Sequence, residues 1–518
     1  MKKRVICAIL SWILCMTFAL TACGGSSNDG EGGPAAQGRD SIAIAISSDS
    51  SDLNPHGIYG MYYARIKSQV YEPLIYRTAD NKLEPCLATE WTWQDDTTLI
   101  LKIREGVKFH NGETLTAQDA LFSLQKVAES SETMAVDKLD LANSSVDGDY
   151  TLILKLKEPD AATTANLAHC TTGIFSQKGY EAANGEFTLD SIGTGPYKWD
   201  EWVSGSYQTL VANEDYWGGA PAIKKVELRV ITEAANRVIA LETGEADFAY
   251  DVSASDIPLV RENENLDLLM FNTNDITGLG FNMTKGVFSD NKNLRYAMIA
   301  AFDRKSAIAL SYVDATAPDT IFDPSTPGTV EGSFPKYDLE AAKEYLAAAG
   351  YPNGGLSVRV HTGSNEARIK IAELFQADLA KIGVNLEIVS LDNAANINAI
   401  AVERNFDMFM WGVAPVTGDL SYALKHFWSK SPSSLNKSGY SNPDYDALLE
   451  EGMETLDESR RFDLYAQAQA MLYDDCPWIP FYAYQNVYAK STTLHGFVEG
   501  SFHSPLWKTW TLSLSSTY

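Results

Sequence analysis

The chain has 518 residues, more than one hydrophobic core usually organises, so we expect two or more lobes. Its formal net charge is −27, and the exported form would be more acidic still once the basic residues at positions 2–4 leave with a signal segment. Such an acidic surface argues against nucleic acid or anionic lipid as a partner and does not identify a ligand.

Residues 1–22 have the pattern of a secretory signal peptide. Three basic residues at positions 2–4 precede an apolar run, Val5 to Leu20, that is too short for a membrane-spanning helix. Ala22 is the small residue that usually stands before a cleavage site. The segment therefore predicts export, not a transmembrane anchor.

The sequence LTAC at residues 20–23 resembles the lipobox of bacterial lipoproteins. This resemblance implies that Cys23 becomes the mature N-terminus and carries a lipid, which would be the chain's only link to a membrane. The alternative is an ordinary signal peptide with an incidental cysteine. Residues 23–40 have no apolar periodicity and are rich in Gly, Ser and Asp, which predicts a flexible tether reaching about 20 to 25 Å.

Three cysteines follow Cys23, at Cys86, Cys170 and Cys476. Their number is odd and their spacing is wide, which favours neither a zinc site nor a disulfide framework. One pair at most could form a disulfide, and the sequence does not decide whether any pair does.

Strand patterns dominate the first part of the chain. Residues 41–46 alternate as a strand does, and residues 99–103 and 151–156 are short β-like runs. Thr116 to Asp119 has the form of a capping box and predicts a helix from Ala120 to Ala128.

Helix patterns are clearer in the second half. Apolar residues from Leu294 to Phe302 follow the spacing of one buried helix face, and Asp338 can cap a helix that runs through Leu346. A further helical stripe, residues 371–382, ends at a glycine that is followed directly by an alternating strand, residues 384–388. A helix joined to a strand in this way is an α/β building step, so we expect mixed α/β lobes.

Several longer segments together resemble the extracytoplasmic solute-binding proteins of family 5, the oligopeptide-, dipeptide- and nickel-binding components of ABC importers. The matches follow one another along nearly the whole exported chain. They are YEPLIY and PCLATEWTWQDDTTLILKIREGVKFHNGETLTAQDALFSL within residues 71–125, GTGPYKWDEW (193–202), NEDYWGGAPAIKKVELRVI (213–231), ALETGEADF (240–248), FNMTKGVFSDNKNLRYAMIAAFDRKSAI (281–308) and YDLEAAKEYLAAAGYPNG (337–354).

The resemblance implies a bilobed α/β fold of the type II periplasmic-binding-protein class, with an extra subdomain and a hinge of two crossing strands. Ligand held between the lobes would favour the closed form, which the permease subunits recognise. It implies a monomer with no cofactor and no bound metal. The implied parts are lobe I (41–70, 186–285 and 488–518), an inserted subdomain (71–185), lobe II (286–487), and crossings near Leu279–Thr284 and Tyr484–Lys490.

The ligand question centres on Trp411, which ends the strand-like run FDMFMW. In peptide-binding relatives an aspartate shortly after this tryptophan pairs with the peptide ammonium, but here Gly412 and Val413 lead into Ala414 and Pro415. The next aspartate is Asp419. Either a longer loop brings Asp419 to the same place, or the ligand is not a peptide with a free amine. A buried ammonium without a partner would cost several kcal/mol.

Further candidate contacts are His56 and Tyr59, in the loop after the first strand, and Asn282 in a crossing strand. An oligosaccharide is an alternative ligand, because Trp411, Tyr422 and Trp428 could form an aromatic platform. A metal chelate is a second alternative, with His56 or His426 near the cleft.

A secreted hydrolase is the alternative from another functional class. The sequence has no Gly-x-Ser-x-Gly elbow, no His-Glu-x-x-His helix and no phosphate-cradling glycine motif. Carboxylate pairs of the glycosidase type remain open, since 68 acidic residues allow many chance pairs. The resemblance implies a binding protein, not an enzyme.

Overall fold

The computed structural model describes residues 39–50, 52–56, 66–78, 80–130, 133–311, 318–497 and 511–512. The predicted signal peptide, the lipidation site Cys23, the tether up to residue 38 and the candidate ligand residue Tyr59 lie outside the described residues.

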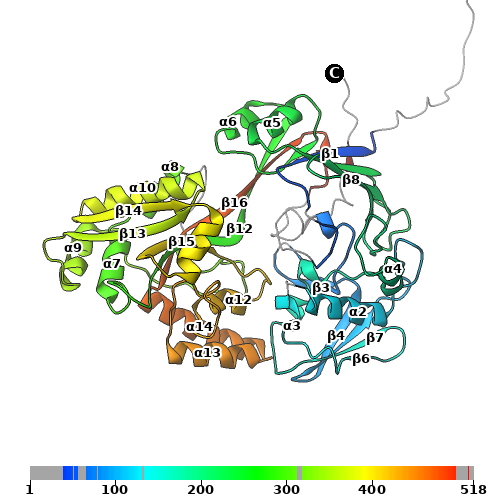
Figure 1. Ribbon diagram of the computed structural model, residues 1–518, viewed down its shortest axis with the longest axis horizontal. Helices are drawn as coiled ribbons and strands as arrows, with labels where there is room; N and C mark the ends of the chain where they lie inside the picture. The colour runs from blue at the N-terminus through cyan, green and yellow to red at the C-terminus, as the bar shows by residue number, and fades with distance from the viewer. Residues whose placement is uncertain are drawn as a thin grey trace, which may run out of the picture. The chain divides into compact units, whose positions relative to one another are not determined.

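A large mixed sheet organises the described part of the chain, in the strand order β14-β13-β15-β12-β16-β11-β1-β10-β9-β8 (Figure 1). Its strands are β1 (Ser41–Ile46), β8 (Tyr197–Val203), β9 (Tyr207–Ala212), β10 (Lys225–Val230), β11 (Phe248–Ala249), β12 (Leu266–Phe281), β13 (Leu356–Gly363), β14 (Val384–Leu391), β15 (Met408–Val413) and β16 (Trp478–Ser491). The predicted first strand is confirmed as β1.

Two long antiparallel strands, β12 and β16, connect the two halves of this sheet (Figure 1). The first part of β12 pairs with the end of β16, and the second part pairs with both β15 and the start of β16. The ladder with β16 is interrupted between Asn272 and Ile276, which leaves residues 273–275 as a bulge. The predicted crossing at Tyr484–Lys490 lies within β16, and that at Leu279–Thr284 begins in β12 and extends beyond its end.

A smaller sheet, β4-β5-β7-β6, lies within residues 71–185 and packs against α2 (Ala117–Ala128). The predicted capping box is confirmed: Thr116 Oγ1 accepts from Asp119 N at 3.4 Å, and Asp119 Oδ2 accepts from Thr116 N at 3.0 Å. The strands are β4 (Ala88–Asp95), β5 (Thr98–Ile103), β6 (Ser145–Val146) and β7 (Thr151–Lys155), with a separate hairpin of β2 (Ile75–Arg77) and β3 (Leu83–Pro85).

The predicted helices of the second half are present as α7 (Lys292–Ala300), α9 (Leu339–Ala348) and α10 (Glu366–Ala380). Asp338 caps α9 by accepting from two backbone N–H groups. The remaining elements are α3 (Thr163–Asn166), α4 (Gln177–Ala182), α5 (Ala234–Glu242), α6 (Ile257–Glu262), α8 (Arg304–Ser311), α11 (Asn393–Ile397), α12 (Leu420–Leu424), α13 (Pro443–Glu454), α14 (Glu458–Asp475), η1 (Thr133–Ala135), η2 (Cys170–Thr172), η3 (Asn398–Val402), η4 (Lys425–Phe427), β17 (Leu494–His495) and β18 (Thr511–Leu512).

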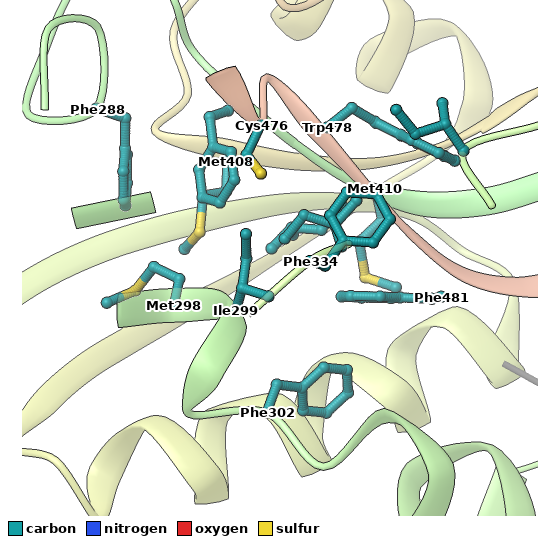
Figure 2. Close-up of a cluster of buried hydrophobic side chains, with 14 of the residues drawn as sticks. Phe288, Met298, Ile299, Phe302, Phe334, Met408, Met410, Cys476, Trp478 and Phe481 are labelled. Carbon is teal, nitrogen blue, oxygen red and sulfur yellow. The ribbon is translucent and has the colours of Figure 1, made fainter. Parts of the chain in front are cut away.

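The largest hydrophobic core surrounds β15 (Figure 2). Met408 and Met410 are fully buried and lie among aromatic side chains such as Phe302 and Phe481. Burying each such side chain contributes about 1.5–3 kcal/mol, so one face of β15 is fixed by packing. Trp411 lies on the opposite face of β15, outside this core.

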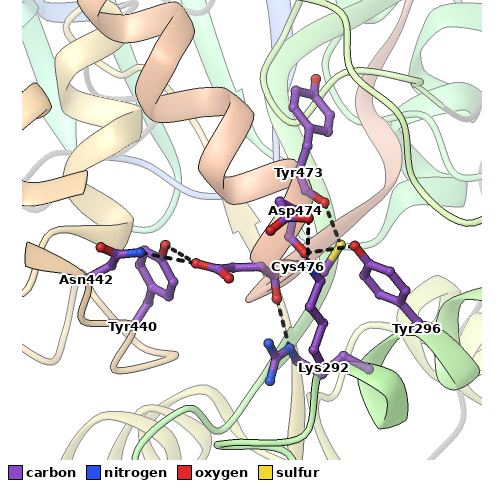
Figure 3. Close-up of polar contacts among 9 residues, drawn as sticks. Lys292, Tyr296, Tyr440, Asn442, Tyr473, Asp474 and Cys476 are labelled. Carbon is purple, nitrogen blue, oxygen red and sulfur yellow. Dashed lines mark hydrogen bonds and ion pairs between the residues drawn. The ribbon is translucent and has the colours of Figure 1, made fainter. Parts of the chain in front are cut away.

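Polar contacts at the end of α14 fix the start of β16 (Figure 3). Lys292 pairs with Asp474, the Tyr440 hydroxyl donates to Asp475 Oδ2 at 2.6 Å, and Arg295 Nε donates to the Asp475 carbonyl at 2.9 Å. Cys476 then adopts a left-handed conformation with φ of 46° and ends the helix. These contacts tie α7 to the helix that precedes the hinge strand.

The structure joins none of Cys86, Cys170 and Cys476, all three within the described residues, in a disulfide. Cys476 is fully buried, and burial raises the pKa of its thiol to about 12. Its Sγ donates to the Tyr473 carbonyl at 3.0 Å, so the thiol is held in the protonated form by its surroundings.

Two contacts join residues 71–185 to the predicted lobe II. Asn81 Nδ2 donates to the Gly418 carbonyl at 3.0 Å, and the Ala161 N–H donates to the Met453 carbonyl at 2.8 Å. The Arg77 guanidinium lies so close to Gly418 that a Cβ there would come within 2.3 Å of it. We call these the interlobe contacts.

Candidate ligand site beside the hinge strands

Trp411 lies on the face of β15 that points away from the methionine core. It is half-buried and packs against a small cluster of Ile400, Phe406 and Phe409. Lys437 Nζ lies 4.4 Å from the ring centroid, within range of a cation–π contact. The indole therefore contacts both an apolar cluster and a charged group.

Gly412 makes room for a carboxylate from the neighbouring strand. A Cβ at this position would stand 2.2 Å from Asp275 Oδ1, closer than any side chain can approach. Asp275 belongs to the bulge of β12, and Gly412 is in register with Thr277. The residue directly after Trp411 is thus small because an acidic side chain occupies the adjacent space.

Two cations flank this carboxylate. Arg368, in the first turn of α10, donates through Nη2 to Thr277 Oγ1 at 3.5 Å, and it lies close enough to Asp275 to affect its pKa. Lys437 acts on Asp275 in the same way. Among the residues that the structure describes, neither cation forms an ion pair with Asp275 within 4.0 Å.

Burial shapes the charges of this site. Burial raises the pKa of the Asp275 carboxyl, while Arg368 and Lys437 act in the opposite direction. Burial also lowers the pKa of the Lys437 ammonium to about 8, and Asp275 partly offsets this effect. The pKa values of Asp275 and Lys437 are thus both shifted by burial, and ionisable groups with shifted pKa values are often found in binding sites.

Lys437 is held in place by its own loop. Asn436 donates from Nδ2 to the carbonyls of Trp428 and Tyr440 at 2.9 Å each, and Arg404 Nη1 donates to the Lys437 carbonyl at 3.1 Å. The ammonium donates to the Ser434 carbonyl. The position of Lys437 over Trp411 is therefore fixed by the fold of this loop.

Three side-chain oxygens around the bulge are buried without a hydrogen bond in the described part of the chain: Asn274 Oδ1, Asp275 Oδ1 and Asn486 Oδ1. Asn486, on β16, is in register with Phe271, just before the bulge. A buried acceptor without a donor costs about 1–3 kcal/mol, and such groups in native proteins call for an explanation.

Asp419 lies at the far end of the loop that follows Trp411. Its Oδ1 accepts from the Ser421 N–H at 2.9 Å, so it caps α12. The loop does not bring it beside Asp275 in any contact among the described residues. Val413 is buried and belongs to the large hydrophobic core around Met408 and Met410.

His56 and Asn282 have structural partners. His56 is 1% exposed, its Nε2 lies 3.1 Å from the Gly173 carbonyl, and burial lowers its pKa to about 4. Asn282 donates from Nδ2 to the Phe406 carbonyl at 2.9 Å, and its Oδ1 accepts from Thr284. The structure thus brings together Trp411 and Gly412 but not these two residues.

The side chains proposed for other ligands have partners of their own. Trp428 Nε1 donates to Glu450 Oε1 at 2.9 Å, and Tyr422 lies next to His426, with ring centroids 6.0 Å apart. Burial lowers the pKa of His426 to about 3. No group of three or more metal-ligating side chains occurs in the described ranges.

The sequence prediction missed Asp275, Arg368 and Lys437. One signal for Asp275 was present: the polar run from Asn272 to Asp275 interrupts a mostly apolar strand. Arg368 and Lys437 lie on a helix and a loop in which charged residues are ordinary, so nothing in the sequence distinguished them.

A separate cavity of about 240 Å³, whose lining does not include Trp411, is formed by residues within 68–86, 168–170 and 196–217. Its lining includes Glu72, Cys86, Cys170 and Trp217. Glu72 is 6% exposed and accepts from Trp217 Nε1 and Thr194 Oγ1, both at 2.8 Å. The motifs YEPLIY, GTGPY and YWGG therefore meet at one buried carboxylate and stabilise the scaffold.

Comparison with known protein families now identifies the scaffold. The family model described as bacterial extracellular solute-binding proteins, family 5 middle, matches residues 82–434. The chain belongs to this family. The predicted resemblance and the predicted type II α/β fold are both confirmed.

Individual relatives match nearly the whole chain. The glutathione-binding protein GsiB of Shigella dysenteriae serotype 1 is 26% identical over 468 residues, which cover 88% of this chain and 91% of the relative. HbpA2 of Haemophilus parasuis has a TM-score of 0.81 at 25% identity, covering 92% and 100% of the two chains. DppA of Helicobacter pylori in complex with the peptide STSA has a TM-score of 0.73 at 25% identity, covering 91% and 98%.

Membership of family 5 makes the chain an extracytoplasmic solute-binding protein of an ABC transporter, and not an enzyme. Within the described residues, no helix has both the length and the apolar character needed to cross a membrane.

Proposed function

We propose that the protein is a lipid-anchored receptor that captures an oligopeptide or dipeptide between two hinged lobes and delivers it to an ABC permease. Cys23 would carry the lipid, and residues 24–40 would hold the folded body near the outer face of the cell membrane. The crossing strands β12 and β16 would form the hinge between lobe I, with its inserted subdomain, and lobe II.

One observation supports a peptide most directly: Lys437 lies over Trp411, and Asp275 lies against the next residue, Gly412, so charges of both signs occur at the end of β15. Asp275 can receive a cationic group, while Arg368 and Lys437 can receive an anionic one. A peptide carries both groups and an apolar body that suits the indole. Charge-assisted hydrogen bonds of this kind are about twice as strong as neutral ones and would favour a zwitterionic ligand.

The same charges argue against a neutral oligosaccharide. Sugars offer hydroxyl groups, which do not compensate the charges of Asp275, Arg368 and Lys437 as a zwitterion would. The relatives support the same conclusion, since one is named for glutathione binding and another holds the peptide STSA.

Native mass spectrometry of the protein extracted from its own cells under non-denaturing conditions tests the proposal. We expect a bound species whose released mass and fragmentation correspond to one peptide per chain. The Trp411→Ala variant, extracted in the same way, should retain much less of it. Release of a glycan or a metal chelate in place of a peptide would contradict the proposal.

A further inference from the structure

The bulge of β12 is the place where the hinge strand leaves its ladder. Residues 273–275 lie between two paired stretches, and all three are polar. Bulges re-aim side chains near binding sites. Here the bulge directs Asp275 toward β15, against the backbone of Gly412.

The unsatisfied atoms around this bulge share one property. Asn274 Oδ1, Asp275 Oδ1 and Asn486 Oδ1 can only accept hydrogen bonds in their ordinary states, and none of them does so among the described residues. The partner that would satisfy Asp275 Oδ1, the one that lies against Gly412, must therefore donate a hydrogen bond. A protonated nitrogen does this and also compensates the charge of the carboxylate.

The local charge balance sets a further condition. Arg368 and Lys437 lie near Asp275 without pairing with it in the described structure, so two cations surround one carboxylate. A ligand that brought only a cation would be repelled by them. A ligand that also brings a carboxylate satisfies both sides of the site, which is the pattern of a zwitterion.

We infer that Asp275, on the hinge strand, receives the protonated nitrogen of the captured ligand. Gly412 provides the space that the Asp275 carboxylate occupies. This inference rests on the proposed function and adds the residue that selects the ligand. It places that residue in the bulge of β12, not in the loop after Trp411. β12 pairs with neighbouring strands before and after the bulge. The residue that binds the nitrogen therefore lies on the same strand that forms the hinge.

Three defined peptide pools test which nitrogen is bound. They are random tripeptides without Lys or Arg, the same pool N-acetylated, and an N-acetylated pool that contains one Lys per peptide. Calorimetry and native mass spectrometry should show the first pool binding at least tenfold tighter than the second. Equal recovery of affinity with the third pool would assign a side-chain ammonium to the site, and no recovery would assign the α-ammonium.

Asp275→Asn keeps the size of the side chain and removes its charge. We expect the preference for unacetylated over acetylated peptides to fall from at least tenfold to less than twofold, with the melting temperature retained. Asp267→Asn is the matched control, because Asp267 lies on the same strand and pairs with Lys490 outside the site. It should leave the preference unchanged.

Gly412→Ala provides a second route if Asp275→Asn does not fold. Its Cβ should displace the carboxylate and reduce the preference in the wild-type background. In an Asp275→Ala background the collision is absent, so Gly412→Ala should have no further effect on affinity.

The outcomes separate the inference from the function on which it rests. If the wild type binds unacetylated and acetylated Lys-free peptides equally, or if Asp275→Asn keeps the preference, Asp275 is not the acceptor while peptide capture stands. If no pool binds at all, both the peptide function and the inference fail.

Discussion

At the scale of single residues, Trp411 combines two environments. Its side chain packs against Ile400, Phe406 and Phe409, and Lys437 lies over its ring. A tryptophan buried on both sides would be a core residue, but here the fully buried positions of β15 are Met408 and Met410.

We therefore expect Trp411→Ala to weaken ligand binding at least tenfold, which is about 1.4 kcal/mol, with little loss of stability. Calorimetry with the co-purified ligand and a melting curve measure the two quantities. A large fall in melting temperature with unchanged affinity would instead make Trp411 a core residue.

Lys437 should make stability depend on pH. Burial lowers its folded-state pKa to about 8, below the ordinary value of 10.5. Between these values the unfolded chain binds more protons than the folded chain, so this residue makes the free energy of unfolding rise as pH increases from about 8 to 10.5.

Denaturant unfolding of the wild type and Lys437→Met across this pH range measures that contribution as a difference. We expect Lys437→Met to lack the rise. Parallel curves for the two proteins would show that Lys437 has no lowered pKa. Cys476, whose pKa burial raises to about 12, acts with the opposite sign and is common to both proteins.

The sequence allowed Trp411 and Gly412 to be placed together because they are neighbours in a recognisable motif. Asp275, Arg368 and Lys437 could not be predicted as partners, since strand register, a helix start and a loop bring them together from distant positions. His56 and Asn282 were proposed from their places in the chain, whereas their partners are set by packing that only the structure shows.

At the scale of elements, local signals predicted α2, α7, α9 and α10, while the other helices were not predicted. The capping residues Thr116 and Asp338 act as expected, and α7 and α10 end within two residues of the predicted stripes. The bulge of β12 was not predicted, because a bulge depends on the partner strand and not on the strand's own pattern.

Asp419 was proposed as a ligand contact, but its carboxylate caps a helix. Because it caps α12, we expect Asp419→Ala to lower stability by about 1 kcal/mol, the usual cost of losing a cap. Denaturant unfolding measures this. If Asp419→Ala removed the preference for unacetylated peptides without changing stability, Asp419 would be the ammonium partner predicted from the sequence.

At the scale of the whole molecule, periodicity alone predicted only mixed α/β lobes. The ordered motifs identified family 5, because the scaffold requires their residues. Trp217 and Thr194, from two of these motifs, both donate to Glu72 in a third. The lobe boundaries stay predictions, and so does the lipid anchor at Cys23.

The anchor is open to a direct test. We expect Cys23→Ser to move the protein from the membrane fraction to the soluble extracytoplasmic fraction, since no lipid could then be attached. Fractionation and immunoblotting measure the distribution, with globomycin-free and globomycin-treated wild type as controls. Unchanged membrane association of Cys23→Ser would contradict lipidation at this residue.

The interlobe contacts, from Asn81 to Gly418 and from Ala161 to Met453, have a consequence for the rate of transport in the proposed function. They join the two sides without any atom of a ligand, so they stabilise the same conformation whether or not cargo is present. In the proposed role of delivery to a permease, stronger contacts would retain cargo longer. They would also let empty receptors occupy the permease and slow the import of the cargo that other copies carry.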